Sequence, residues 1–217
     1  DVIVLGGLIN EIMESFERVI FPSDKVKVEP RKDIHRIQKL TSKTSWKNLS
    51  VLWLELEEKL PDEFHSLTNL QVNELEVWRI MQGLPISKNE INGKQNPFEL
   101  GLTDLVSLNK GCYLGQEAMA RIVRNDSLRQ QLRIWRIKSI INKGLEVRNL
   151  IETPVFYSDN KIVGVITSAI KSSTNDILGL ALIKKKYLSF QTLYILEDLI
   201  QIDLDIPCGF KKISDLA

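Results

Sequence analysis

The sequence predicts an α+β protein that divides near residue 126 into a mixed region of helices and strands and a small antiparallel β-barrel. Two observations carry this prediction. In residues 1–126, segments with a helical spacing of apolar residues alternate with short strand-like runs. In residues 127–217, short alternating segments follow one another at close intervals, which is typical of a small barrel or sandwich.

The first region is predicted to contain strands where short runs are apolar or alternating, and helices where apolar residues recur every three or four positions. In chain order the predicted elements are a strand at residues 2–5, a helix at 8–20, a strand at 26–28, a strand at 51–56 and a helix at 72–81. The glutamates of residues 51–56 also permit a helix there. Gly83 ends the last helix. The stretch 87–101 is rich in Asn, Gly, Lys and Pro and is predicted to be a surface loop.

The second region is predicted to contain five or six strands. They cover residues 132–137, 155–157, 162–167, 177–183, 193–196 and 200–206. The polar residues 158–160 separate two of them and predict a hairpin turn.

The composition sets broad limits on function. The net charge of +1 gives no global field, so nucleic-acid binding would need a local basic patch. The run Lys184-Lys185-Lys186 could touch phosphate, but a charge run after a strand is usually a solvated turn, and we expect no direct contact with nucleic acid. Two cysteines and two histidines make a metal site improbable. No apolar run is long enough to cross a membrane, and we expect a cytoplasmic protein.

Distinctive residue types are concentrated in residues 110–117, Lys-Gly-Cys-Tyr-Leu-Gly-Gln-Glu, which we call the Cys112 segment. Cys112 is the candidate nucleophile, because Lys110 and a helix beginning near Gly115 would favour its thiolate. Tyr113 offers a flat face to a heteroaromatic ring, and Gln116 can donate and accept at once, which suits the amide-like edge of a pterin.

The residues of this segment also permit other interpretations. Glu117 could accept a hydrogen bond from an amino group or act as a base. Against a functional reading, a single cysteine is most often a small buried hydrophobe, and glycines most often serve turns.

The Cys112 segment resembles the KGCYxGQE signature of the folate-binding YgfZ family, which is related to the aminomethyltransferase (T protein, GcvT-like) of the glycine cleavage system. Further matches lie on both sides of the segment. They are Arg79-Ile80 with Gly83 and Pro85, Pro97 with residues 99–102, residues 163–168, and Gly179-Leu180-Ala181. The resemblance therefore covers most of the chain.

The resemblance implies a folate-binding α+β module of ferredoxin-like type in residues 1–126, a C-terminal barrel in residues 127–217, and tetrahydrofolate or a derivative as cofactor. It implies a role in assembling or repairing iron–sulfur clusters, including those of tRNA-modifying enzymes, with such client proteins as partners. Cys112 would be the key residue, with Lys110, Tyr113 and Gln116 shaping the site. Arg79 would orient the segment or contact the folate tail.

Two departures bear on the reaction. T proteins carry a glutamate two positions after the arginine that matches Arg79, and that carboxylate holds the pterin; this chain has Met81 there. Met81 therefore favours the YgfZ branch. The second departure is that the chain begins at Asp1 inside an apolar run, so we expect the first part of a typical member to precede it.

Two other functions stay open. One is a folate-dependent transferase of one-carbon units similar to the aminomethyltransferase. The other is a non-catalytic interaction module, in which the barrel docks a client protein and the folate site is vestigial.

Overall fold

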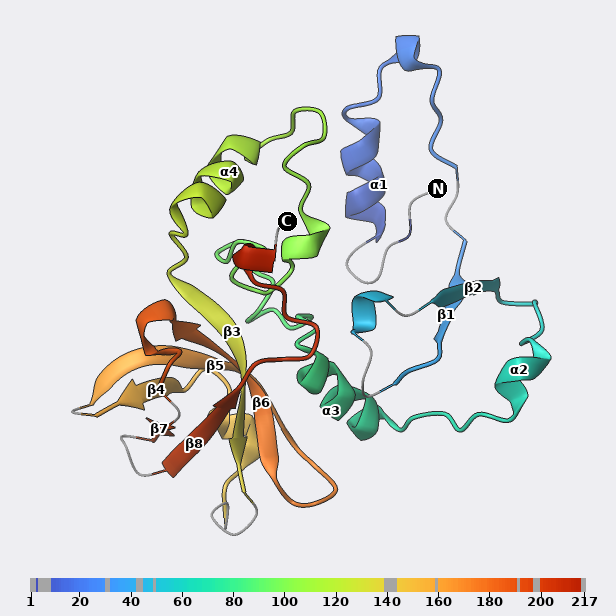
Figure 1. Cartoon of the computed structure of the whole chain (residues 1–217). Helices are drawn as coiled ribbons and strands as arrows, with labels where there is room; N and C mark the ends of the chain where they lie inside the picture. The colour runs from blue at the N-terminus through green and yellow to red at the C-terminus, as the bar shows by residue number, and fades with distance from the viewer. Residues whose placement is uncertain are drawn as a thin grey trace. The chain divides into compact units, whose positions relative to one another are not determined.

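The computed structural model describes residues 3, 9–29, 32–41, 45–48, 50–138, 144–158, 160–190, 192–196 and 200–215 (Figure 1). The chain forms two compact units. The first comprises Asp1–Gln38 and Val51–His65, and the second Lys39–Ser50 and Ser66–Ala217. The domain division near residue 126 stays a prediction. The strand predicted at residues 2–5 lies, apart from Ile3, outside the described residues.

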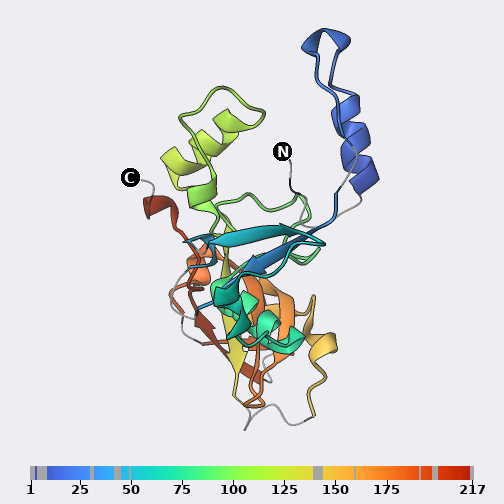
Figure 2. The ribbon, with the colours of Figure 1, turned by 90° about the vertical axis from the view of Figure 1, so that its right-hand side faces the viewer.

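The first unit contains helix α1 (Ile9–Glu17), strands β1 (Ile34–Gln38) and β2 (Val51–Glu55), and the short helix α2 (Asp62–His65). The predicted helix and the strand at residues 51–56 are confirmed. The two strands pair antiparallel, from Ile34 opposite Glu55 to Gln38 opposite Val51, and form the twisted ribbon of Figure 2. A ferredoxin-like arrangement of this region stays a prediction.

The strand predicted at residues 26–28 is wrong. These residues belong to no strand, Val26 is 58% exposed, and Lys25 just before it has a left-handed φ of 52°. Alternation describes a side-chain pattern, but a strand also needs a neighbour for its backbone groups. In this unit β2 pairs with β1, whose first three residues are exposed and whose sequence carries little alternating signal.

The second unit is built on a closed barrel of six antiparallel strands in the order β3-β6-β5-β4-β7-β8 (Figure 1). The strands are β3 (Gln130–Ile137), β4 (Pro154–Tyr157), β5 (Lys161–Lys171), β6 (Ile177–Lys184), β7 (Thr192–Ile195) and β8 (Ile200–Asp205). All six predicted strands are confirmed, and β4 and β5 form the predicted hairpin. Helices α3 (Val72–Gln82) and α4 (Gln116–Asn125) belong to the same unit.

Strand β6 is buried on both faces. Ile177, Ala181 and Ile183 point into the barrel core with Trp135. The alternate residues, such as Leu178 and Leu180, belong to a second core outside the barrel, to which α3 contributes its Ile80. This double burial explains why β6 reads as an almost continuous apolar run and not as an alternating one.

The stretch 87–101 is a loop as predicted, but only part of it, including residues 91–94, lies on the surface. Glu90, Phe98, Glu99 and Leu100 are all buried, and the Glu99 carbonyl accepts a backbone hydrogen bond of 2.8 Å from Leu132 of β3. Ile91 is exposed, whereas Leu100 packs in the second core with residues of β3 and β6.

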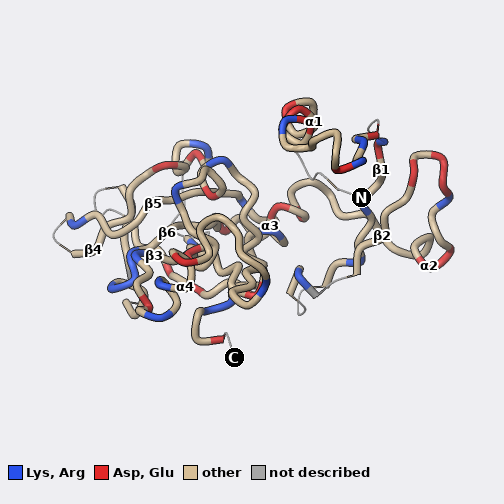
Figure 3. The backbone as a smooth tube through the Cα atoms, turned by 90° about the horizontal axis from the view of Figure 1, so that it is seen from above, with Lys and Arg blue, Asp and Glu red and all other residues tan. Residues whose placement is uncertain are grey.

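Charged residues of both signs are distributed along the whole backbone trace (Figure 3). Among the described residues, no helix has the length and apolar character that crossing a bilayer requires.

Candidate functional site

The Cys112 segment leads into α4, which begins at Gln116 as predicted. Gly115 caps the helix with a φ of +87°, a conformation that costs glycine little and other residues more. Gly111 has no such φ, and a Cβ added there would meet nothing within 4 Å. The backbone around Gly111 is therefore open to an approaching molecule.

The carboxamide of Gln116 ties the segment together. Its Nε2 donates to the carbonyls of Leu108 at 2.9 Å and Lys110 at 3.2 Å, and its Oε1 accepts from the backbone N–H of Tyr113 at 3.3 Å. Three of its four hydrogen-bonding positions are thus used by neighbouring backbone. Gln116 therefore shapes the loop. Only one lone pair of its carboxamide oxygen is not used by these three bonds and could serve the predicted contact with a pterin.

Cys112 is exposed, and so are Lys110 and Glu117. The Lys110 ammonium lies 5.1 Å from the centre of the Tyr113 ring, a cation–π distance. Tyr113 is half-buried, and its hydroxyl is buried with no hydrogen-bond partner among the described residues. The segment therefore presents a thiol and an ammonium to solvent beside a tyrosine whose hydroxyl has a hydrogen bond to offer.

Arg79 lies elsewhere, in the last turn of α3, and is 5% exposed. Its guanidinium binds both carboxylate oxygens of Glu76 at 2.7 and 2.8 Å, Glu90 at 3.2 Å, the Leu84 carbonyl at 2.7 Å and Ser168 Oγ at 3.0 Å. These contacts occupy all five N–H donors. Burial lowers the pKa of Arg79, but the hydrogen bond to Glu76 and the charges of Glu90 and Glu76 outweigh it and raise the pKa.

The centre of this network is Glu90, which the sequence did not single out. It is fully buried. Its Oε2 accepts from Arg79 and from the backbone N–H groups of Ile86 and Ser87 at 2.9 and 3.1 Å. Its Oε1 accepts from the hydroxyls of Thr167 and Ser168 at 3.2 and 2.8 Å. Five donors therefore converge on one buried carboxylate.

A β-bulge in β5 makes this convergence possible. Ile166 pairs with Ala181 and Ser168 with Leu180, so Thr167 is the extra residue. Successive side chains of a regular strand point to opposite faces, and a bulge re-aims one of them. Both hydroxyls thereby reach the same oxygen of Glu90.

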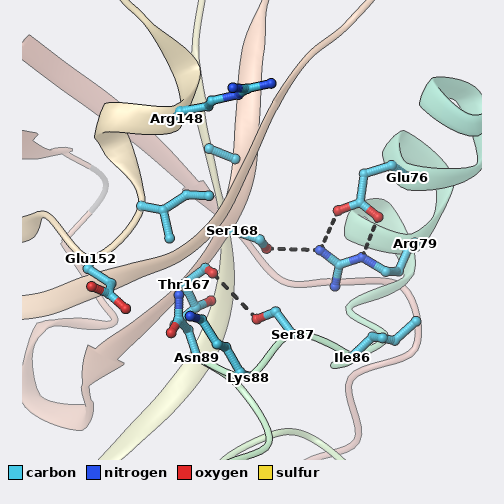
Figure 4. A pocket seen from close by; sticks show the side chains of 12 residues that line it. Glu76, Arg79, Ile86, Ser87, Lys88, Asn89, Arg148, Glu152, Thr167 and Ser168 are labelled. Carbon is cyan, nitrogen blue, oxygen red and sulfur yellow. Dashed lines mark hydrogen bonds and ion pairs between the residues drawn. The ribbon is translucent and has the colours of Figure 1, made fainter. Parts of the chain in front are cut away.

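A cavity of about 580 Å³ lies over this network (Figure 4). Its lining includes Ser87, Lys88 and Asn89 from the loop, Thr167 and Ser168 from β5, and Arg148 from the 3₁₀ turn Val147–Leu150. None of the residues 110–117 lines it. Arg79 and the Cys112 segment are thus parts of two different local structures, and no hydrogen bond or ion pair among the described residues joins them.

Met81, where T proteins carry glutamate, is 38% exposed. Nη2 of Arg136 on β3 lies 3.6 Å from its sulfur, and Nε of the same arginine is buried without a hydrogen-bond partner among the described residues. A carboxylate at position 81 would meet a guanidinium there, whereas the thioether is only a weak acceptor. Within the described part of the chain, no three metal-ligating side chains gather.

No family model matches the chain. A stretch of 131 residues, 59% of the chain, is 33% identical to the chloroplastic "putative transferase" of Arabidopsis thaliana. A stretch of 112 residues, 50% of the chain, is 30% identical to the aminomethyltransferase of Thermoanaerobacter pseudethanolicus. Each match spans 28% of the relative's own length.

Among solved structures, the glycine cleavage system aminomethyltransferase T of Bartonella henselae aligns with 63% of this chain and 38% of its own, at 14% identity and a TM-score of 0.49. The sequence similarities point to the aminomethyltransferases and related transferases. They do not distinguish the YgfZ branch.

Proposed function

We propose that the chain belongs to a tetrahydrofolate-binding protein of the YgfZ type, which acts in the cytoplasm and supports the assembly or repair of iron–sulfur clusters. The observation that carries this proposal is the Cys112 segment: its signature residues are combined with an exposed thiol. The sequence similarity to an aminomethyltransferase supports folate as the ligand.

The structure of the segment suits a site completed by a ligand. The thiol of Cys112 and the ammonium of Lys110 face solvent, the backbone at Gly111 is open, and the Tyr113 hydroxyl lacks a partner within the described residues. A buried hydroxyl without a partner costs about 1–3 kcal/mol, which a ligand acceptor would recover if its binding displaced the groups that cover the hydroxyl. Arg79 enters this proposal as a residue that fixes α3 to the barrel, because its donors are already engaged.

Calorimetric titration of tetrahydrofolate into the gene product that carries this chain tests the ligand. We expect tetrahydrofolate to bind, with its affinity retained in Cys208→Ser and reduced in Tyr113→Phe. Cys208 is the control because it is exposed like Cys112 but lies outside the Cys112 segment. Absence of binding under reducing, oxygen-free conditions would overturn the proposal. Restoration of iron–sulfur enzyme activity in cells that lack a YgfZ-type protein tests the role, and Cys112→Ser should abolish it.

A folate-dependent aminomethyltransferase is the second candidate, favoured by the 30% identity to such an enzyme. Formation of methylenetetrahydrofolate from an aminomethyl donor would establish it. We expect the protein to form no methylenetetrahydrofolate, because its Met81 thioether cannot hold a pterin amino group as a carboxylate does.

A further inference from the structure

Five cationic side chains gather at one end of the barrel. Arg129, Lys184, Lys185 and Lys186 line a groove of about 630 Å³ together with Leu128. Lys161 lies at the same end, and we call the five cations with Leu128 the cation groove. No carboxylate lines the groove.

The strand register explains this gathering. β3 begins where β6 ends, because Gln130 pairs with Lys184. The Lys185 N–H donates to the Arg129 carbonyl at 2.9 Å. The Lys184 ammonium donates to the carbonyl of Ile162, the residue after Lys161 at the start of β5, at 2.8 Å.

The positive charge of the groove is only partly neutralised. Lys185 pairs with exposed Asp126 at 2.6 Å, and no other ion pair is present at these five cations in the described residues. The positive charge of the groove acts on Tyr187, whose ring centre lies 5.1 Å from the Lys186 ammonium. Burial raises the pKa of Tyr187, but its hydrogen bond to Lys161 and the charges of Lys161 and Lys186 outweigh burial and lower the pKa below 10.

An aromatic cluster adjoins the cations. The rings of Tyr157, Tyr187 and Phe190 lie with centroids 4.5–5.8 Å apart. Phe190 is 37% exposed and follows Lys186 in the same turn, where its N–H donates to the Tyr187 carbonyl. An accessible ring beside ammonium groups is the combination that stacks a base while neutralising its phosphates.

We propose that the cation groove docks the phosphodiester backbone of a single-stranded nucleic acid, with Phe190 stacking on a base. This goes beyond the proposed folate-dependent function, and it departs from the expectation from the sequence that Lys184-Lys185-Lys186 is a solvated turn without direct contact to nucleic acid. An acidic peptide would use the charges but not the ring, and arginine forks would suit its carboxylates better than the ammonium point charges that dominate here.

Fluorescence anisotropy with a labelled twelve-residue oligothymidylate tests the proposal. Five phosphate contacts on a single strand predict a salt slope of about −3.5, and thus an affinity about 100-fold weaker at 200 mM than at 50 mM NaCl. The double variant Arg129→Gln/Lys161→Gln removes two contacts and should reduce this loss to about 20-fold.

The matched control is Lys138→Gln/Lys171→Gln, which removes two exposed lysines at or just beyond the opposite ends of the same two strands. It should behave as the wild type. If circular dichroism shows that Arg129→Gln/Lys161→Gln is unfolded, Arg129→Gln/Lys186→Gln takes its place.

Phe190→Ala should weaken binding about tenfold without changing the salt slope, because stacking releases no counterions. The proposal is overturned if the oligonucleotide does not bind at 50 mM NaCl or if both double variants lose affinity equally. It is also overturned if a twelve-residue polyglutamate binds as tightly as the oligonucleotide, which would assign the groove to acidic proteins. Competition by free ATP at micromolar concentration would likewise assign it to a mononucleotide.

Discussion

Replacing Glu90 with glutamine removes one negative charge from the buried network and leaves its shape almost unchanged. The amide oxygen can keep the three donors that now face Oε2. The NH₂ group then faces the Thr167 and Ser168 hydroxyls, which must turn from donating to accepting. Thr167 can do so by donating to the Leu180 carbonyl, 3.1 Å away. Among the described residues, Glu76 is then the one ionic partner that Arg79 keeps.

The expected cost follows from the charge that is lost. A hydrogen bond to a charged group contributes about 1.5–3 kcal/mol and one between neutral groups about 0.5–1.5 kcal/mol, and the bonds of Glu90 to two backbone N–H groups and two hydroxyls change from the first kind to the second. Removing one partner of a buried ion pair costs about 3–5 kcal/mol in all. Because glutamine fills the same space and keeps part of the bonding, we expect a loss of about 3 kcal/mol in the free energy of unfolding.

Urea unfolding followed by tryptophan fluorescence measures this loss, since Trp135 donates to the Ser168 carbonyl beside the network. With a slope of about 2 kcal/mol per molar urea, the midpoint should fall by about 1.5 M. The control is Glu99→Gln in the same loop. Glu99 is also buried, but it accepts a single bond of 3.5 Å from the neutral side chain of Gln130. The Glu99→Gln substitution should lower the free energy of unfolding by less than about 1 kcal/mol.

Equal midpoints for Glu90→Gln and Glu99→Gln would refute the reasoning. The five converging donors would then contribute no more than one neutral hydrogen bond, and the junction of α3 with the barrel would rest on apolar packing alone.

Gly111→Ala should leave the unfolding free energy unchanged or raise it by up to about 1 kcal/mol, yet weaken tetrahydrofolate binding; a stable variant with undiminished calorimetric affinity would place the ligand elsewhere. Tyr187→Phe should remove from the absorbance titration a tyrosine that ionises below pH 10. The Tyr187 hydroxyl loses its proton at lower pH in the folded state than in the unfolded state. The unfolding free energy of the wild type should therefore rise relative to that of the variant as the pH increases from the lowered pKa to 10. A difference that shrinks with pH would contradict a lowered pKa for Tyr187. Gly179→Ala should lower the unfolding free energy by about 1–3 kcal/mol, since its Cβ would overlap the Ser168 carbonyl and approach Trp135 Nε1 to 2.7 Å; an unchanged melting temperature would show that β5 and β6 can separate freely.

Most of the elements that were predicted correctly bury apolar residues in one or both of the two cores of the second unit. Strands β3 to β8 and helix α3 bury continuous or periodic apolar faces, so their periods appear in the sequence. Strand β1 was missed because its first three residues are exposed. Its assignment depends on β2, which begins 13 positions after it ends.

The candidate site shows the same division. The start of α4 could be predicted, because the hydrogen bonds of Gln116 that shape it are local. Glu90 could not be predicted, since its hydroxyl partners lie 77 and 78 positions away and meet it only through a bulge. A glutamate among Asn, Lys and Gly has the composition of a solvated turn, and only the folded chain shows that it is buried.

The ties made by Gln116 span three, six and eight positions. Closing such short loops takes little chain entropy and can happen before the barrel has assembled. The turn that presents the exposed thiol is therefore determined by residues 108–116 alone. The same residues could form this turn at the start of a helix in a different protein. The buried network around Glu90, in contrast, exists only where this barrel does.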